Sequence, residues 1–213
     1  MNANIYANES LLVLDIFESM YHDQYDLYIP NKVDNKKPPL YIILPGGVDE
    51  KYISFRDSLI VPGLKDHQGI IFSPKISWKK PDEKLLENII TDFISTAIKA
   101  YSIDQNKITL IGYSNGAIQA TKLAEQKGYL FSTVVLMVSN FNITKKIETP
   151  IFIIHGTTDR YFSLKKANKA YTLAKKIGCN VTFLKAEGKN DTPPSQYKNE
   201  LRELTRWLEN NIW

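Results

Sequence analysis

A glycine-serine turn between a short apolar run and a helix-like pattern constrains this chain most. Residues 107–127 read KITLIGYSNGAIQATKLAEQK, where the apolar run 108–111 leads into Gly112-Tyr113-Ser114-Asn115-Gly116. A Gly-x-Ser-x-Gly turn between a strand and a helix is the nucleophile elbow, whose strained backbone lifts a serine hydroxyl above the carboxyl edge of a sheet. The two glycines are expected because side chains there would collide where strand and helix meet. The alternative is an ordinary helix N-terminus capped by Ser or Asn after a glycine turn.

Strand-like and helix-like segments alternate along the rest of the chain. The expected strands are Leu11–Phe17, Tyr25–Ile29, Leu40–Leu44, Gly69–Phe72, Ile108–Ile111, Thr133–Val138, Ile151–Ile154 and Val181–Leu184. Helices are expected over Asp82–Tyr101, Ser163–Ile177 and Gln196–Trp213, and after Ser114. This order predicts an α/β fold with a doubly wound, mostly parallel sheet whose functional loops lie at the carboxyl edge. The first two strands are expected to form an N-terminal antiparallel edge hairpin.

Length and the short connections bear on domain organisation. The 213 residues predict a single domain, 1–213. Only a short segment, 139–150, connects two expected strands late in the chain, so we expect no lid domain and an open site.

Composition excludes several classes of function. The net charge is +4 and the lysines are scattered in pairs, so no basic stripe predicts nucleic-acid binding. The single cysteine, Cys179, excludes an internal disulfide. Leu11–Phe17 is interrupted by Asp15 and no cationic segment precedes it, so neither a signal peptide nor a membrane span is expected and the cytoplasm is the predicted location. No metal-ligand cluster or phosphate-binding glycine loop is found, so no metal and no cofactor are predicted.

Two glycines follow the apolar run Leu40–Leu44. After Pro45, Gly46 and Gly47 leave backbone N–H groups free to point into open space at the end of a buried strand. Such an arrangement suits an anion or an oxyanion. As a bare dipeptide, Gly-Gly is also compatible with a simple turn.

Two segments give the chain a family resemblance. GYSNGA at 112–117 and IFIIHGTTDRYF at 151–162 resemble the small phospholipase/carboxylesterase group of serine esterases, within the α/β-hydrolase fold and over nearly the whole chain, and more loosely the feruloyl esterases. The resemblance implies Ser114 as the nucleophile and Asp159 as the triad acid. It also implies an oxyanion hole from the N–H of Asn115 and an N–H of the Gly46-Gly47 loop, and a small-molecule ester as the substrate.

The residues themselves agree with the order nucleophile, then acid. A serine hydroxyl needs a base to take its proton and a third group to orient that base. Asp159 leaves a buried strand at the same sheet edge as Ser114 and is placed for the orienting role, although it would also serve as the cap of the helix that starts near Ser163. His155 stands at the end of that strand and is expected to be structural.

The general base is missing from the sequence. In the relatives it is a histidine in the loop after the last strand, and here that loop, Ala186–Thr192, has none. His22 and His67 lie early in the chain and do not match. Lys189 or Asn190 occupies the expected position, depending on the register. A lysine must be neutral to accept a proton, so if Lys189 faces Asp159 we expect an ion pair instead of a base.

Two functions follow from this pattern. The first is a carboxylesterase acting on small or exposed acyl esters through Ser114, with weak or unusual activity and with Lys189 or a displaced histidine as base. The second is an inactive pseudohydrolase that binds a small ligand or a protein partner in the same pocket. Pocket side chains are expected from loops 48–55, 73–78 and 141–146, with Trp78 as a possible aromatic wall.

Overall fold

The computed structural model describes residues 2–30, 37–47, 52–75, 77 and 81–213, of which residues 2–9 are described by their backbone alone. The seven strands found in these residues form one sheet, ordered β1-β3-β2-β4-β5-β6-β7. Neighbouring strands are parallel throughout, except that β1 runs antiparallel to β3. The strands are β1 (Tyr25–Tyr28), β2 (Leu40–Leu44), β3 (Ile70–Pro74), β4 (Ile108–Tyr113), β5 (Thr133–Met137), β6 (Ile151–Gly156) and β7 (Val181–Ala186).

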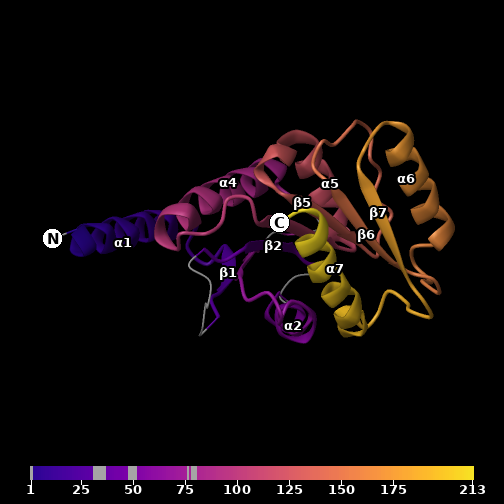
Figure 1. Ribbon diagram of the computed structural model, residues 1–213, viewed down its shortest axis with the longest axis horizontal. Coiled ribbons are helices and arrows are strands. Elements are labelled where there is room, and N and C mark those ends of the chain that lie inside the picture. Colours follow the sequence, from indigo (N-terminus) through magenta and orange to yellow (C-terminus); the bar gives the residue numbers. More distant parts are fainter. Residues whose placement is uncertain (1, 31–36, 48–51, 76, 78–80) are drawn as a thin grey trace.

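Helices cover both faces of this sheet, as Figure 1 shows. The main helices are α1 (Asn2–Tyr21), α4 (Glu83–Ala100), α5 (Asn115–Lys127), α6 (Leu164–Lys176) and α7 (Lys198–Asn211). A continuous helical run comprises α2 (Tyr52–Phe55), the π-helical turn η1 (Arg56–Ile60) and α3 (Val61–Gly63). Short 3₁₀ turns, η2 (Gly128–Leu130) and η3 (Pro194–Tyr197), follow α5 and precede α7.

Alternate residues of the central strands enter two separate cores. In β2, Leu40, Ile42 and Leu44 pack with α1, α4 and α5, whereas Tyr41 and Ile43 face the side of η1 and α7. The same alternation holds in β4, β5 and β6. Because both faces are buried, each strand reads as a continuous apolar run, which is typical of a parallel sheet with helices on either side. The expected doubly wound α/β fold is confirmed.

The N-terminal hairpin was predicted wrongly. Residues 11–17 belong to α1, and the edge strand β1 pairs with β3, with Tyr25 opposite Pro74 and Tyr28 opposite Ile71. A short apolar run fits either a strand or a buried helix, and packing decides between them. Phe17 is buried against Phe93 of α4, with ring centroids 5.3 Å apart, and Tyr21 one turn later is buried as well.

Several helix boundaries follow from local chemistry. The Asp82 side chain accepts a hydrogen bond of 2.9 Å from the backbone N–H of Leu85 and so caps the start of α4. Gly178, with φ +87°, ends α6, as the sequence predicts. Between β5 and β6, residues 139–150 run as an irregular segment whose Phe141, Ile143 and Ile147 side chains are buried.

Candidate active site

Ser114 stands in a strained conformation at the junction of β4 and α5. Its φ of 53° and ψ of −120° are unfavourable for any residue with a Cβ. The backbone N–H of Ser114 donates a hydrogen bond of 2.9 Å to the carbonyl of Met137 on the neighbouring strand, which holds the turn against the sheet. The serine is partly exposed. The strand, sharp turn and helix expected for an elbow are therefore all present.

The two motif glycines are required by close contacts. A Cβ at Gly112 would lie 2.6 Å from the Cα of Ala117 in α5. A Cβ at Gly116 would lie 1.8 Å from the carbonyl oxygen of Leu44, so this glycine makes room for β2. The steric role predicted for both glycines is confirmed, with the carboxyl end of β2 as an additional neighbour.

The loop after β2 lies directly against the serine. A Cβ at Gly46 would be 2.5 Å from the Cβ of Ser114 and 3.2 Å from its Oγ. Gly47 follows with φ +93°. Asn115 is the first residue of α5, so its backbone lies at the positive end of the helix dipole. The structure thus brings together Ser114, Asn115 and Gly46, the residues from which an oxyanion hole is predicted.

Asp159 is held in a turn after β6. Its side chain is fully buried, and Oδ1 accepts hydrogen bonds from the backbone N–H groups of Tyr161 (2.9 Å) and Phe162 (2.7 Å). Oδ2 has no hydrogen-bond partner among the described residues. The carboxylate therefore caps its own turn and makes no capping bond to α6, the alternative that the sequence left open.

None of the three histidines is hydrogen-bonded to Ser114. His155 is fully buried, and its Nε2 donates to the carbonyl of Phe162 at 2.7 Å, which fits the structural role expected for it. His22 pairs with Glu18 on α1. His67 pairs with Glu209 at 2.7 Å and stacks on Trp213.

In the loop after β7, the side chains of Lys189 and Asn190 point in different directions. The Lys189 ammonium turns toward α7, where it forms an ion pair with Glu200 and donates to the carbonyl of Gln196 at 2.5 Å. No ion pair or hydrogen bond joins it to Ser114 or Asp159 within the described chain. The ion pair expected if Lys189 faced Asp159 does not form, because the ammonium pairs with Glu200 instead. Asn190, in contrast, faces the turn that holds Asp159, since its Oδ1 accepts a hydrogen bond of 3.0 Å from the backbone N–H of Arg160.

Two buried tyrosines fix this loop to the rest of the site. The hydroxyl of Tyr197 donates to the carbonyl of Asn190 at 2.6 Å, and the hydroxyl of Tyr113, beside the serine, donates to the carbonyl of Asp191. Burial raises the pKa of both phenols, so both remain donors at neutral pH. Sequence reasoning missed Tyr197 and Glu200, because only the folded chain brings α7 to this loop. Tyr113 carried a signal, its place inside the elbow motif.

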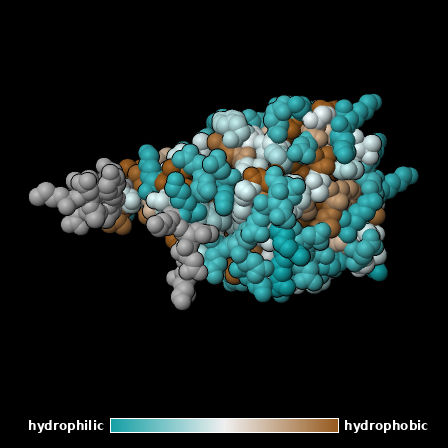
Figure 2. Space-filling view, viewed as in Figure 1, coloured by the Kyte–Doolittle hydropathy of each residue, from teal (hydrophilic) through white to brown (hydrophobic). Residues whose placement is uncertain are grey.

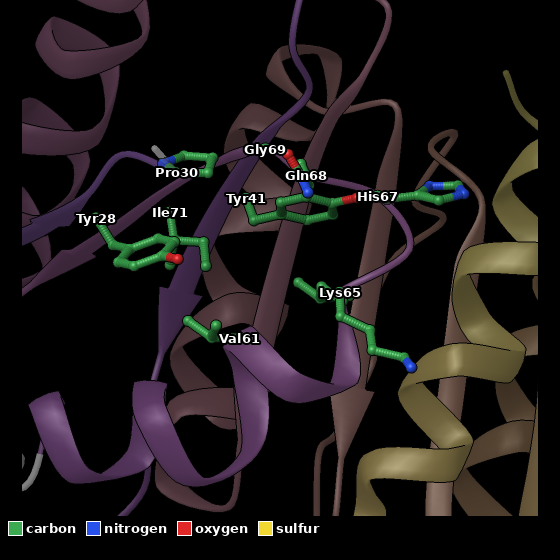
Figure 3. A pocket seen from close by; sticks show the side chains of 10 residues that line it. Tyr28, Pro30, Tyr41, Val61, Lys65, His67, Gln68, Gly69 and Ile71 are labelled. Atoms are coloured by element: carbon green, nitrogen blue, oxygen red, sulfur yellow. The ribbon is translucent and has the colours of Figure 1, made fainter. Parts of the chain in front are cut away.

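A separate hollow lies at the opposite edge of the sheet, shown in Figure 3. This cavity of about 390 Å³ is lined by Tyr28 of β1, Val61 of α3, and Tyr41, Gln68 and Ile71 near the amino ends of β2 and β3. Ser114 does not line it. Of the loops expected to form the substrate pocket, residues 48–51, 76 and 78–80 lie outside the described residues, and these include Trp78.

Two negative findings apply to the described part of the chain. It contains no group of three or more His, Cys, Asp or Glu residues arranged to hold a metal ion. Within the same residues, every helix is too short or too polar to cross a bilayer.

Comparisons with known proteins agree with this geometry. Residues 72–212, well over half of the chain, match the family described as Phospholipase/Carboxylesterase. The search of curated proteins gives no match.

Solved structures share the fold at low sequence identity. A truncated carbohydrate esterase from gut microbiota is 16% identical with a TM-score of 0.72, over 88% of this chain and 91% of that one. The Bacillus cereus carboxylesterase is 19% identical with a TM-score of 0.62, over 95% and 99%. A thermostable esterase is 18% identical with a TM-score of 0.66, and the match covers 87% of this chain but 58% of that one. With its elbow, its sheet order and this family match, the chain belongs to the phospholipase/carboxylesterase family of esterase-type hydrolases with the α/β-hydrolase fold.

Proposed function

We propose that the protein is a carboxylic ester hydrolase that uses Ser114 as its nucleophile on small or exposed acyl esters, with weak activity. One observation carries the proposal: Ser114 is held at φ 53° and ψ −120°, in close contact with Gly46. Such strain costs of the order of 1–3 kcal/mol, persists only where the surrounding structure enforces it, and clusters at active sites.

The proposed reaction has two steps. The Ser114 oxygen bonds to the acyl carbon and the alcohol leaves with a proton; water then attacks the acyl-enzyme, releases the acid and returns the proton to the serine. The N–H of Asn115 and an N–H of the Gly46-Gly47 loop stabilise the oxyanion in both steps.

We expect proton transfer to limit the rate of the proposed reaction. The Asn190 amide is not a base, and the Lys189 ammonium is held by Glu200. In a serine protease, loss of the triad histidine lowers turnover by about 10⁶, and the oxyanion hole and binding leave roughly 10³–10⁴ over the reaction in water. We therefore expect slow turnover with activated esters.

The second candidate is a pseudohydrolase that binds a small ligand or a protein partner at the same edge of the sheet. The amide of Asn190 favours the pseudohydrolase, because this side chain faces the turn that holds Asp159 and has no basic nitrogen. In this case Ser114 contributes a hydroxyl to binding and no covalent step occurs.

Reaction with a fluorophosphonate probe separates the two candidates. The esterase proposal predicts stoichiometric, slow labelling that mass spectrometry maps to Ser114 and that Ser114→Ala abolishes. If the folded protein shows no adduct after prolonged incubation, the esterase proposal fails and the pseudohydrolase remains.

We propose that the protein is located in the cytoplasm, in keeping with a single, buried, free cysteine.

A further inference from the structure

The helix α1 carries an exposed apolar ridge. Leu12, Ile16 and Met20, spaced one turn apart, are 58%, 51% and 56% exposed. They lie beside the stripe that contains Phe17 and Tyr21, which is buried on α4. Figure 1 shows α1 extending well beyond the sheet. In Figure 2, brown apolar atoms lie among polar ones where the coloured part of this protrusion meets the body of the molecule. A contiguous apolar surface of this kind marks an interaction site in a folded protein.

A groove runs along the same face of the molecule. It has a volume of about 290 Å³ and lies between α1 and α4, with Asp92, Ser95, Thr96 and Lys99 forming its α4 wall. Ile16 and Met20 line it as well as standing on the ridge. The α1 wall of the groove is apolar, so a second copy turned about a two-fold axis can place its own ridge against this wall.

The charges in the groove also suit a two-fold partner. Ser10 Oγ donates to the carbonyl of Lys99, and the Tyr21 hydroxyl donates to Asp92, so α1 and α4 run in opposite directions. The groove therefore has a cation at one end and an anion at the other. Two copies related by a two-fold axis across the groove place Lys99 of one opposite Asp92 of the other. Lys99 makes no ion pair with any residue that the structure describes.

A membrane surface fits this face less well. Residues 2–21 contain Glu9, Asp15 and Glu18 but no Lys or Arg. Helices that lie in a bilayer interface are typically rich in Lys and Arg, which anionic lipids attract.

We propose that the protein forms a two-fold symmetric dimer through α1 and α4, in which the ridge Leu12-Ile16-Met20 of each copy fills the α1–α4 groove of the other. This interface lies apart from Ser114, so the proposal is independent of the proposed esterase activity.

Sedimentation equilibrium of the full chain from about 1 to about 200 µM tests it, since a dimer dissociates with dilution. Wild type is expected to pass from monomer to dimer over this range. Leu12→Glu and Ile16→Glu are expected to raise the dissociation constant by about 100-fold or more, because each removes two apolar side chains from a two-fold interface. The matched control Leu173→Glu, on exposed α6, is expected to dimerise as wild type does.

Charge variants test the two-fold arrangement. Lys99→Glu is expected to weaken the dimer by about 10-fold and Lys99→Gln by less, because only the first repels Asp92 of the other copy. Thermal unfolding and circular dichroism establish that each variant is folded. The proposal is overturned if wild type stays monomeric at the highest concentration, including the case in which it binds anionic vesicles instead, or if folded Ile16→Glu dimerises as tightly as wild type.

Discussion

The side-chain oxygen of Asn190 accepts a hydrogen bond of 3.0 Å from the backbone N–H of Arg160, the residue after Asp159. The loop in which the family resemblance implies a histidine base thus presents an amide to the turn that holds Asp159. Lys189 points elsewhere, to Glu200. Together with the strained Ser114, this contact underlies our proposal of a serine nucleophile without a histidine base.

Gly46→Ala is expected to block the serine. Its Cβ would lie 2.5 Å from the Ser114 Cβ and 2.8 Å from the carbonyl of Tyr113, neither of which is the end of a flexible side chain. Fluorophosphonate labelling should fall at least 10-fold, as an obstructed nucleophile requires. Gly47→Ala is the control, since no described atom outside its chain neighbours lies within 4 Å of the added Cβ, and its positive φ opposes the change by about 1 kcal/mol. Equal labelling of Gly46→Ala and wild type would contradict the close approach.

Ser114→Gly is expected to stabilise the protein. Glycine relieves the cost of φ 53°, of the order of 1–3 kcal/mol, and loses up to about 1 kcal/mol through its freer unfolded chain. The melting temperature should rise by roughly 2–4 °C for each net kcal/mol. Ser114→Ala keeps the Cβ and should show no such gain, so similar melting temperatures for the two variants would argue against strain at the elbow.

Lys189→Met is expected to lower the stability of the protein. The ion pair is mostly buried, at 20% exposure for Lys189 and 12% for Glu200, so loss of one partner should cost about 1–3 kcal/mol in the free energy of unfolding. The double change Lys189→Met with Glu200→Met should recover part of this loss, because no carboxylate is left unpaired. Urea unfolding measures both. A folded Lys189→Met protein with unchanged stability but labelling slowed 100-fold would instead identify Lys189 as the base.

Stability is expected to fall at alkaline pH. Burial raises the pKa of Tyr113, Tyr197 and Tyr41 above the ordinary value of 10.0, and burial together with Asp92 raises that of Tyr21 to about 12. A raised folded-state pKa means that the stabilisation is complete below about pH 10 and is lost as pH rises through the folded-state values. Urea midpoints between about pH 8 and about pH 12 measure this. The loss should be smaller in Tyr197→Phe, and a midpoint that stays constant to pH 12 would contradict it.

Much of this fold was predictable because its signals are local. The alternation of Leu40–Leu44 and Ile108–Ile111 with amphipathic segments identifies a parallel sheet, and the motif at 112–116 locates the elbow. The run 11–17 was assigned wrongly because its helical state depends on Phe93, far along the chain. The choice between Lys189 and Asn190 was likewise beyond the sequence, since it depends on Glu200 and on the turn at Arg160.

We propose that Ser114 is ready to react and lacks a base because position 190 carries an amide. Measurement of kcat/KM for p-nitrophenyl acetate with Asn190→His tests it most directly, with Ser114→Ala as the background and Lys189→His as the matched variant one residue away. We expect a gain of roughly 10-fold or more for Asn190→His, below the usual range for a well-placed general base, and a smaller gain for Lys189→His. A wild-type kcat/KM already above about 10⁴ M⁻¹s⁻¹, or a folded Asn190→His protein no faster than wild type, would contradict it.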